Sequence, residues 1–200
     1  MAKTPLNKAE LTRRKRQLAT FQRFLPSLEM KRKQLLAART RERRALDELR
    51  QRRRDARDRA AQALPMLADT RIPLDELVTI DAVDLGEQNL VGVALPTVRE
   101  VRLRTAPYGY LAMPHWVDDL AAALREQLDL NAREQVAEAR LARIEEGVRT
   151  VTKRVNLFDK ILIPRSKREI QRIEIALADA ERAGVVRAKI AKRKRAEVAA

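Results

Sequence analysis

Few residues of this sequence have the type and spacing that catalysis or metal binding requires. Asp118–Asp119 and Glu145–Glu146 are paired acids, but adjacent helix positions point in different directions, so neither pair shares a site. The 200 residues include no cysteine, and His115 is the only histidine, which leaves too few ligands for a histidine- or cysteine-based metal site. Phosphate-binding loops, dinucleotide fingerprints and nucleophile elbows are absent as well. We therefore predict no catalytic residue, no metal ligand and no cofactor.

Basic side chains are the remaining candidates for a functional surface. Lys and Arg outnumber Asp and Glu by 43 to 28, a net charge of +15, and the first 64 residues alone hold 20 basic residues against 7 acidic ones. Runs of this density bind polyanions, so nucleic acid and an acidic protein surface are both expected partners, and composition does not choose between them. The densest runs are Arg13–Arg16, Arg41 with Arg43–Arg44, Arg52–Arg54 and Lys192–Arg195.

Two smaller features have competing interpretations. The stretch Tyr108-Gly109-Tyr110 could stack on nucleobases, but no basic groove surrounds it, so a turn that packs both rings onto a helix is favoured. His115 beside Trp116 is interpreted as a helix start, because a proline precedes it and two acids follow in the first turn.

The elements that carry these residues follow from apolar residues spaced alternately by three and four. This spacing predicts a coiled-coil seam on a helix within residues 1–64 and another within 116–200. The central seam positions are Leu18, Phe21, Leu25, Leu28, Leu141, Ile144, Val148, Val151, Val155, Phe158 and Leu162. Arg32, Arg39 and Glu42 interrupt the first seam, which suggests local loosening or contact with a third chain.

Proline marks an irregularity in each helix. Pro26 lies inside the first pattern and is expected to kink or break that helix. In the second helix the stripe shifts phase by one residue at Pro164 and resumes at Ile163, Ile170, Ile173 and Leu177.

The fold class predicted is mainly α, with a long antiparallel two-helix coiled coil formed by the N- and C-terminal segments. Opposing positions have numbers that add up to about 180 if Leu64 faces Trp116, so Phe21, Phe24 and Phe158 should meet. Residues beyond about 175 should overhang the first helix as a basic tip.

The middle segment, residues 65–115, is predicted to be a small insert with a β-hairpin. Two β-rich runs place the hairpin at about 89–104, with the turn at Pro96-Thr97, and Leu74–Ile80 should form a short helix. Together with residues 1–64 and 116–200 the insert is expected to make one structural unit.

One stretch carries a family resemblance. Arg154-Val155-Asn156 leads through apolar residues into Ile163-Pro164-Arg165, and this resembles the C-terminal signature of the D subunit of the V-type (vacuolar/archaeal-type) rotary ATPases and ATP synthases, in a bacterial-looking version. The continuation Ile170, Ile173, Leu177, Asp179, Glu181, Arg187 and Lys189 is similar to that family, as is the opening with Pro5, Leu11, Arg13–Arg16, Leu18, Leu25 and Leu28.

The resemblance implies a non-catalytic central-stalk protein, the rotor shaft. Such a shaft transmits torque between a catalytic hexamer of A and B subunits and a membrane rotor ring. It couples ATP hydrolysis or synthesis to proton or sodium transport. The implied partners are the A, B and F subunits and a socket protein on the ring, without nucleic acid and without direct membrane insertion. The implied location is cytoplasmic, peripheral to the membrane in the V1-type sector.

On this interpretation the basic residues near both ends of the chain form a collar that faces acidic residues of the hexamer. The collar hypothesis names Arg13, Arg14, Arg16, Arg165, Lys167 and Arg168. Two alternatives remain: a basic coiled-coil nucleic-acid-binding protein, and the stalk of another export machine, which would lack both the Arg-Val-Asn to Ile-Pro-Arg stretch and the hairpin insert.

Overall fold

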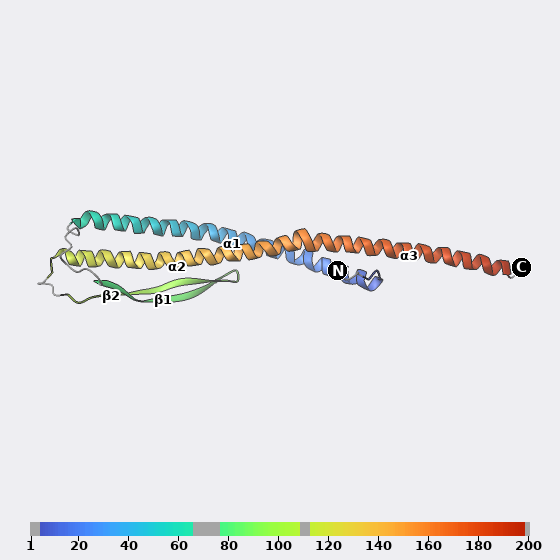
Figure 1. The fold of residues 1–200 in the computed structure, drawn as a ribbon, viewed down its shortest axis with the longest axis horizontal. Helices are drawn as coiled ribbons and strands as arrows, with labels where there is room; N and C mark the ends of the chain where they lie inside the picture. The colour runs from blue at the N-terminus through green and yellow to red at the C-terminus, as the bar shows by residue number, and fades with distance from the viewer. Residues whose placement is uncertain (1–4, 66–76, 109–112, 199–200) are drawn as a thin grey trace. The chain divides into compact units, whose positions relative to one another are not determined.

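The computed structural model describes residues 5–65, 77–108 and 113–198, and it is mainly α-helical as predicted. In chain order the elements are α1 (Lys8–Ala63), β1 (Val78–Leu90), β2 (Val93–Thr105), α2 (Trp116–Asn156), a π-helix η2 (Leu157–Leu162) and α3 (Ile163–Val198) (Figure 1). They form two compact units, one of Arg32–Thr150 and one of Met1–Lys31 with Val151–Ala200. The prediction of a single structural unit stays a prediction.

In the unit Arg32–Thr150, α1 and α2 run antiparallel and close around a hydrophobic end. Leu64, at the end of α1, lies in one buried cluster with Trp116, Val117 and Leu120 at the start of α2. This is the expected facing of Leu64 and Trp116, and α2 begins at Trp116, directly after His115. Tyr108 packs against the cluster and its hydroxyl donates to Asp118 Oδ1 at 2.6 Å. Tyr110 is outside the described residues.

The seam of α1 follows the predicted spacing over most of its length. Leu35, Leu46 and Ala56 are at most 3 % exposed, and the seam positions Leu18, Phe21, Leu25 and Leu28 are half-buried. The same alternating steps of three and four, begun at Leu11, also lead to Arg39 and Ala63, and these two positions were wrong. Both are exposed, and their neighbours Ala38 and Leu64 are buried instead. A straight helix drifts against a strict seven-residue repeat, so the buried position moves by one residue.

Two charged seam residues of this unit, Glu42 and Arg53, pair with opposite charges on the facing helix, whereas Arg32 makes no ion pair within the described residues. The Glu42 carboxylate accepts hydrogen bonds from Arg140 Nε at 3.1 Å and from Arg140 Nη2 at 2.7 Å. Arg53 Nε lies 3.0 Å from Glu134 Oε2, and Glu134 is only 7 % exposed. Arg50 also donates to Glu138 and Glu134, and these two hydrogen bonds raise the pKa of Arg50 above its ordinary value. The interruption at Glu42 is therefore a contact and not a loosening.

The β-hairpin is present, but its turn was predicted in the wrong place. β1 and β2 pair antiparallel from Val78↔Thr105 to Leu90↔Val93, and the two-residue turn is Val91-Gly92. Both turn residues have positive φ, 53° and 78°, as a type I′ hairpin turn requires. Asn89 Oδ1 accepts a hydrogen bond from the Gly92 amide at 2.8 Å.

Pro96, the expected turn residue, lies inside β2 opposite Glu87. A two-stranded sheet consists only of edge strands, where a missing amide donor is tolerated. The expected helix Leu74–Ile80 is also wrong where the structure describes it, because Val78–Ile80 begin β1. All three of these residues are β-branched and favour a strand.

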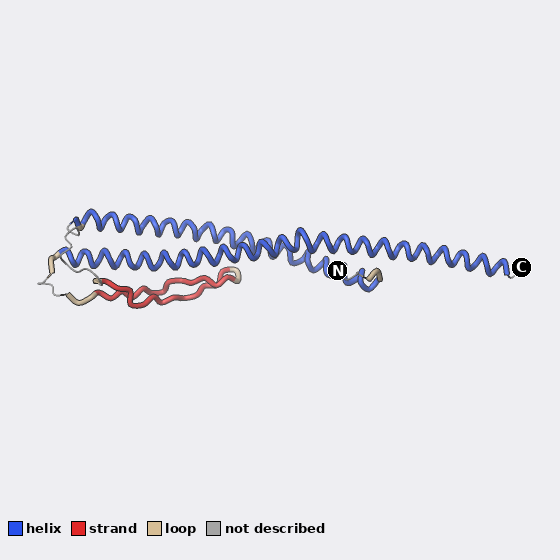
Figure 2. The backbone as a smooth tube through the Cα atoms, in the orientation of Figure 1, coloured by secondary structure: helices blue, strands red, loops and turns tan. Residues whose placement is uncertain are grey.

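The hairpin lies along α2 (Figure 2). Leu95 on β2 is completely buried, as are Leu35 on α1 and Ile144 on α2. A Cβ built on Gly147 would stand 2.8 Å from Val93 Cγ2 and 3.7 Å from Leu35 Cδ1. The absence of a side chain at Gly147 is thus what allows β2 to approach α2 so closely.

In the other unit, the first part of α1 packs antiparallel to η2 and α3. Asn7 caps α1 by accepting the Glu10 amide at 2.8 Å. Phe21 and Phe158 meet edge to face, with ring centroids 5.4 Å apart. Phe24 does not join them, because it is 54 % exposed; it is one position before the seam residue Leu25 and points off the seam.

Pro26 does not break α1, which is continuous from Lys8 to Ala63. The cost of the missing amide donor is outweighed by the flanking seam residues Leu25 and Leu28, which remain half-buried. At the other end of this unit α3 continues past the start of α1 (Figure 1), as expected for an overhang. Val185, Val186 and Ile190 there are 49 to 68 % exposed.

We expect Gly147→Ala to destabilise the protein, although alanine favours helices. The helix gains about 1 kcal/mol from the substitution, but the new Cβ forces apart Val93 and the helix at a net cost of about 1–3 kcal/mol. Urea denaturation followed by circular dichroism would measure this.

Gly184→Ala is the matched control, because no atom lies within 4 Å of a Cβ at Gly184, and it should be neutral or stabilising. Val93→Ala combined with Gly147→Ala should restore most of the loss. Equal effects of the two single glycine substitutions would contradict the close packing at Gly147.

Candidate functional site

The six collar residues and the family motif lie in the unit Met1–Lys31 with Val151–Ala200, whereas the basic runs Arg41–Arg44 and Arg52–Arg54 lie in the other unit. The basic residues lie on the first turns of α1 and the first turns of α3, and the stretch from Arg154 to Arg165 spans the end of α2, all of η2 and the start of α3. The antiparallel seam places the two basic segments at the same level, because α1 begins opposite α3.

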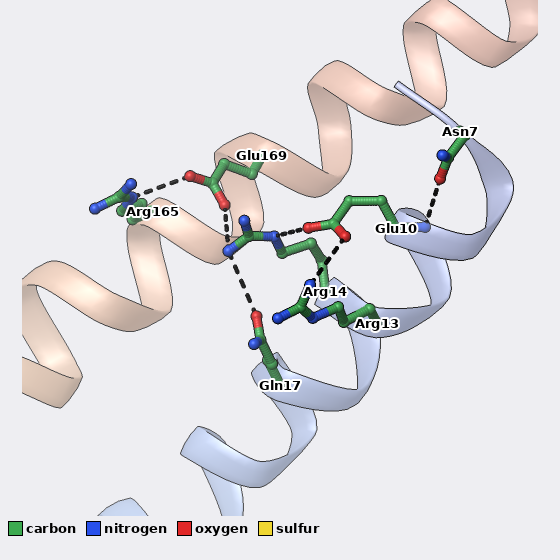
Figure 3. A network of polar contacts seen from close by, with 7 residues as sticks. All are labelled: Asn7, Glu10, Arg13, Arg14, Gln17, Arg165 and Glu169. Atoms are coloured by element: carbon green, nitrogen blue, oxygen red, sulfur yellow. Dashed lines mark hydrogen bonds and ion pairs between the residues drawn. The ribbon is translucent and has the colours of Figure 1, made fainter. Parts of the chain in front are cut away.

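Two carboxylates inside this basic region bind the arginines (Figure 3). Glu10 is 8 % exposed. Its carboxylate accepts a hydrogen bond from Arg14 Nε at 2.7 Å and lies 3.6 Å from Arg13 Nη1. Glu169 on α3 lies 2.9 Å from Arg14 Nη1 and 3.0 Å from Arg165 Nε. Arg14 thereby connects α1 to α3 and is itself a seam position, with a side chain 25 % exposed.

The six predicted collar residues therefore fall into two groups. Arg14 and Arg165 come together on Glu169, and part of their charge is compensated there. Arg16, Lys167 and Arg168 are exposed and make no ion pair within the described part of the chain. Arg13 is 71 % exposed and only loosely paired.

A cation next to the collar shows the same register. Lys15 Nζ lies 2.7 Å from Glu174 Oε1. Together with the Arg14–Glu169 pair it fixes the position of α3 along α1 in this unit.

The motif stretch folds as a π-turn between two α-helices. The amide of Ile163 donates to the carbonyl oxygen of Phe158, five residues earlier. Arg154-Val155-Asn156 is the last turn of α2, and Ile163-Pro164-Arg165 is the first turn of α3. Because Pro164 has no amide hydrogen, the regular helix would lose a donor here in any case, and the wider turn accommodates the proline.

The π-turn explains the phase shift that the sequence predicts at Pro164. Along the seam Val155 is 3 % exposed and Phe158 is half-buried, and the next buried position is Ile163, five residues on. After it the regular spacing returns with Ser166, Ile170 and Ile173, all at most 9 % exposed. One extra residue is thus absorbed just before the proline, and the stripe keeps facing α1.

The outer side of η2 is apolar but not packed. Leu157 is 43 % exposed and Ile161 is 54 % exposed, and no residue of η2 is fully buried. The seam here depends on the edge-to-face contact of Phe158 with Phe21.

The chemistry available to this arrangement is contact through charge and shape. Within residues 5–65, 77–108 and 113–198, no group of three His, Asp or Glu side chains could hold a metal ion. In the same ranges no helix is both long and apolar enough to cross a membrane.

Sequence reasoning missed the acidic partners, Glu10 and Glu169. A signal was present: Arg14 interrupts the apolar seam, and Glu169 lies near the position that the antiparallel register places opposite it. A charged seam residue indicates an opposite charge at the facing position, because a buried charge needs a partner.

Comparisons with known proteins agree over nearly the whole chain. A sequence model of the family described as the D subunit of ATP synthase matches residues 10–193. The D subunit of the V-type ATP synthase of Borreliella burgdorferi is 27 % identical over 96 % of this chain and 95 % of the relative. The proteins of the same name from Chlamydia pneumoniae and Chlamydia muridarum are 32 % and 31 % identical, over 94 % of this chain and 91 % and 94 % of their own length.

The π-turn predicts that the chain tolerates the loss of one residue there better than elsewhere in the second helix. In a Pro164→Ala background, deletion of exposed Lys160 should convert η2 to regular α-helix and keep the seam in phase, so the unfolding free energy should change by less than about 1 kcal/mol.

Deletion of exposed Arg172 in the same background is the control. It rotates Ile173, 1 % exposed, out of the seam and should cost about 2–5 kcal/mol. Thermal and urea unfolding of both variants measure the difference. Equal destabilisation by the two deletions would show that η2 does not absorb an extra residue.

Proposed function

The chain belongs to the D-subunit family of V-type ATP synthases, and we propose that it acts as the central-stalk shaft of such an enzyme. In this role it transmits torque between the catalytic A/B hexamer and the membrane rotor ring, and so couples ATP hydrolysis or synthesis to proton or sodium transport. The observation that carries the proposal is the pair of antiparallel helices held in one register by charged seam contacts, Arg14–Glu169 in one unit and Glu42–Arg140 in the other.

The mechanism needs a stiff and asymmetric shaft. Each catalytic interface opens or closes according to the face of the shaft that it meets, so the nucleotide affinity of the interface depends on the rotation angle. The shaft acts through contacts that differ between the conformations of the hexamer, which is the condition for energetic coupling. Slack between the two helices would lose that coupling, and charged seam pairs oppose slack because separating them leaves a charge unpaired.

The collar is the proposed bearing surface toward the hexamer. It comprises Arg13, Arg14, Arg16, Arg165, Lys167 and Arg168 and would face acidic residues of the bore. Arg14 and Arg165 are partly neutralised by Glu169, so the four other side chains supply most of the outward charge. Exposed cations opposite an acidic wall attract at long range and leave few apolar contacts that would resist rotation.

The opposite end of the shaft is proposed to dock the other rotor parts. Residues 65–115 and the adjacent helix would contact the F subunit and the socket protein on the ring. The chain would thus be a non-catalytic component, peripheral to the membrane in the V1-type sector, with protein partners and no nucleic acid.

Reversing the outward collar charges should weaken coupling. We expect Arg16→Glu, Lys167→Glu and Arg168→Glu together to lower the affinity for the A/B hexamer at least roughly tenfold at low salt, and to reduce ATP-driven ion pumping per ATP hydrolysed. None of the three makes an ion pair within the described residues, so the fold should be retained. Binding is measured with purified hexamer, and pumping with the whole enzyme in vesicles.

The matched control is Arg43→Glu, Arg44→Glu and Arg57→Glu, three exposed cations of α1 in the other unit. It changes the net charge equally, and measured at the same salt concentration as the collar variant it should lower hexamer affinity much less, by no more than about twofold. Unchanged assembly and pumping in the first variant would show that the collar does not face the hexamer.

A further inference from the structure

We infer that the β-hairpin acts as a splint, which means that it stiffens the helix pair α1–α2 against twisting. Two contacts hold it in place: the hydrogen bonds of Arg140, and the packing of Val93 into the space left by the missing side chain of Gly147, here called the Gly147 notch. This inference rests on the proposed function, because a torque shaft is where torsional stiffness matters. It assigns the hairpin a mechanical task, separate from any docking of partner proteins.

The hairpin is fastened at its base and near its tip, in both cases within the unit Arg32–Thr150. At its base, Val78 belongs to the buried cluster that includes Trp116 and Val117, and Leu103 packs against the same cluster. At its tip, Val93 fits against Gly147. Leu95, two residues after Val93 and also near the tip, is completely buried.

Arg140 is the polar fastening point, and it joins three elements with one guanidinium group. Nε and Nη2 donate to both carboxylate oxygens of Glu42 on α1. Nη1 donates to the carbonyl oxygen of Pro96 on β2 at 3.0 Å, and Nη2 lies 3.4 Å from Gln88 Oε1 on β1. The arginine side chain is only 16 % exposed. A planar guanidinium holds several acceptors in fixed directions, which a lysine ammonium does not.

The lengths of the fastened elements match. Thirteen residues in each strand at about 3.3 Å per residue span about 43 Å. The stretch of α2 from Val117 to Gly147, at about 1.5 Å per residue, spans about 45 Å. In Figure 1 the hairpin runs beside α2.

Such an arrangement opposes twisting for a geometric reason. When two helices twist about a common axis, an element attached beside them at both ends has to bend or slide. Sliding would break the Arg140 hydrogen bonds and move Val93 out of the notch, where the cavity left behind is costly. Register shifts after Ile80 and after Asp84 increase the local twist of the hairpin, which lets it follow the helix pair at rest.

The test compares an unfastened hairpin with one that is fastened again covalently. Arg140→Met removes the polar fastening point, and Arg133→Met is the control, because the ion pair of Arg133 is with Asp129 on its own helix. The native chain has no cysteine, so Val93→Cys with Gly147→Cys introduces a single disulfide between positions whose closeness suits one. The triple variant R140M/V93C/G147C is studied oxidised and reduced.

The main readout is the angular fluctuation of a gold particle attached to the shaft in the A/B hexamer, during the pause before ATP binds. We expect Arg140→Met and the reduced triple variant to increase the angular variance at least roughly twofold, because the helix pair loses its lateral support. The oxidised triple variant and Arg133→Met should have the variance of the parent. A merely structural loss of stability would not be reversed by one cross-link at the tip while the arginine is still missing.

A second readout uses the isolated chain and does not depend on the hexamer. Hydrogen exchange at seam amides of α1 and α2 beside the hairpin should be faster in Arg140→Met and should slow again on oxidation of the triple variant. Parent-like variance and exchange in Arg140→Met would overturn the splint, and so would a failure of the disulfide to restore them. If instead the parent chain neither assembles with the hexamer nor rotates in it, the proposed function fails, and the exchange experiment still decides the inference.

Discussion

The structure depends on one interaction: three charged seam residues, Arg14, Glu42 and Arg53, each meet an opposite charge on the facing helix. Arg14 meets Glu169 in one unit, and Arg53 meets Glu134 in the other. Apolar seams of leucine, valine and alanine are similar along their length, so they tolerate a shift of one heptad. A shifted register would instead place these half-buried charges against apolar side chains, where an unpaired charge is costly. The pairs add little stability by themselves, but they make one alignment much better than its neighbours.

The π-turn follows from the same constraint. The seam on α2 and the seam on α3 both have to face α1, yet the sequence between them has one residue more than a regular helix accommodates. The extra residue is absorbed where Pro164 would weaken an α-helix in any case, and the Ile163 amide bonds to Phe158 instead. The Arg-Val-Asn and Ile-Pro-Arg segments that mark the family in the sequence are the two turns on either side of this adjustment. Part of the motif is therefore a requirement of geometry.

The spacing of apolar residues in the sequence predicted those features that are set by packing of each helix against the facing helix. Most buried positions of α1, the contact of Phe21 with Phe158 and the overhang of α3 follow from periodicity and the antiparallel register. The turn at Val91-Gly92 was not predictable in the same way, because valine rarely adopts positive φ and Pro96-Thr97 has the better turn composition. The turn is placed by long-range contacts, since Val93 has to reach Gly147 and Leu95 has to be buried. The six collar residues could be named from the sequence. Which of them are paired with Glu169 and which remain exposed depends on the tertiary structure.

The basic residues therefore have two different physical roles, which cannot be told apart from the composition alone. Some cations hold the helices together: Arg14, Arg50, Arg53 and Arg59 each pair with a carboxylate on the facing helix. Others, such as Arg16 and Lys167, are exposed and make no ion pair within the described residues. Only the second group is available to an acidic partner, because compensated charges contribute little to the field outside the protein. The net charge of +15 thus indicates how strongly an acidic surface is attracted. The placement of the paired arginines decides which faces of the helices can contact that surface.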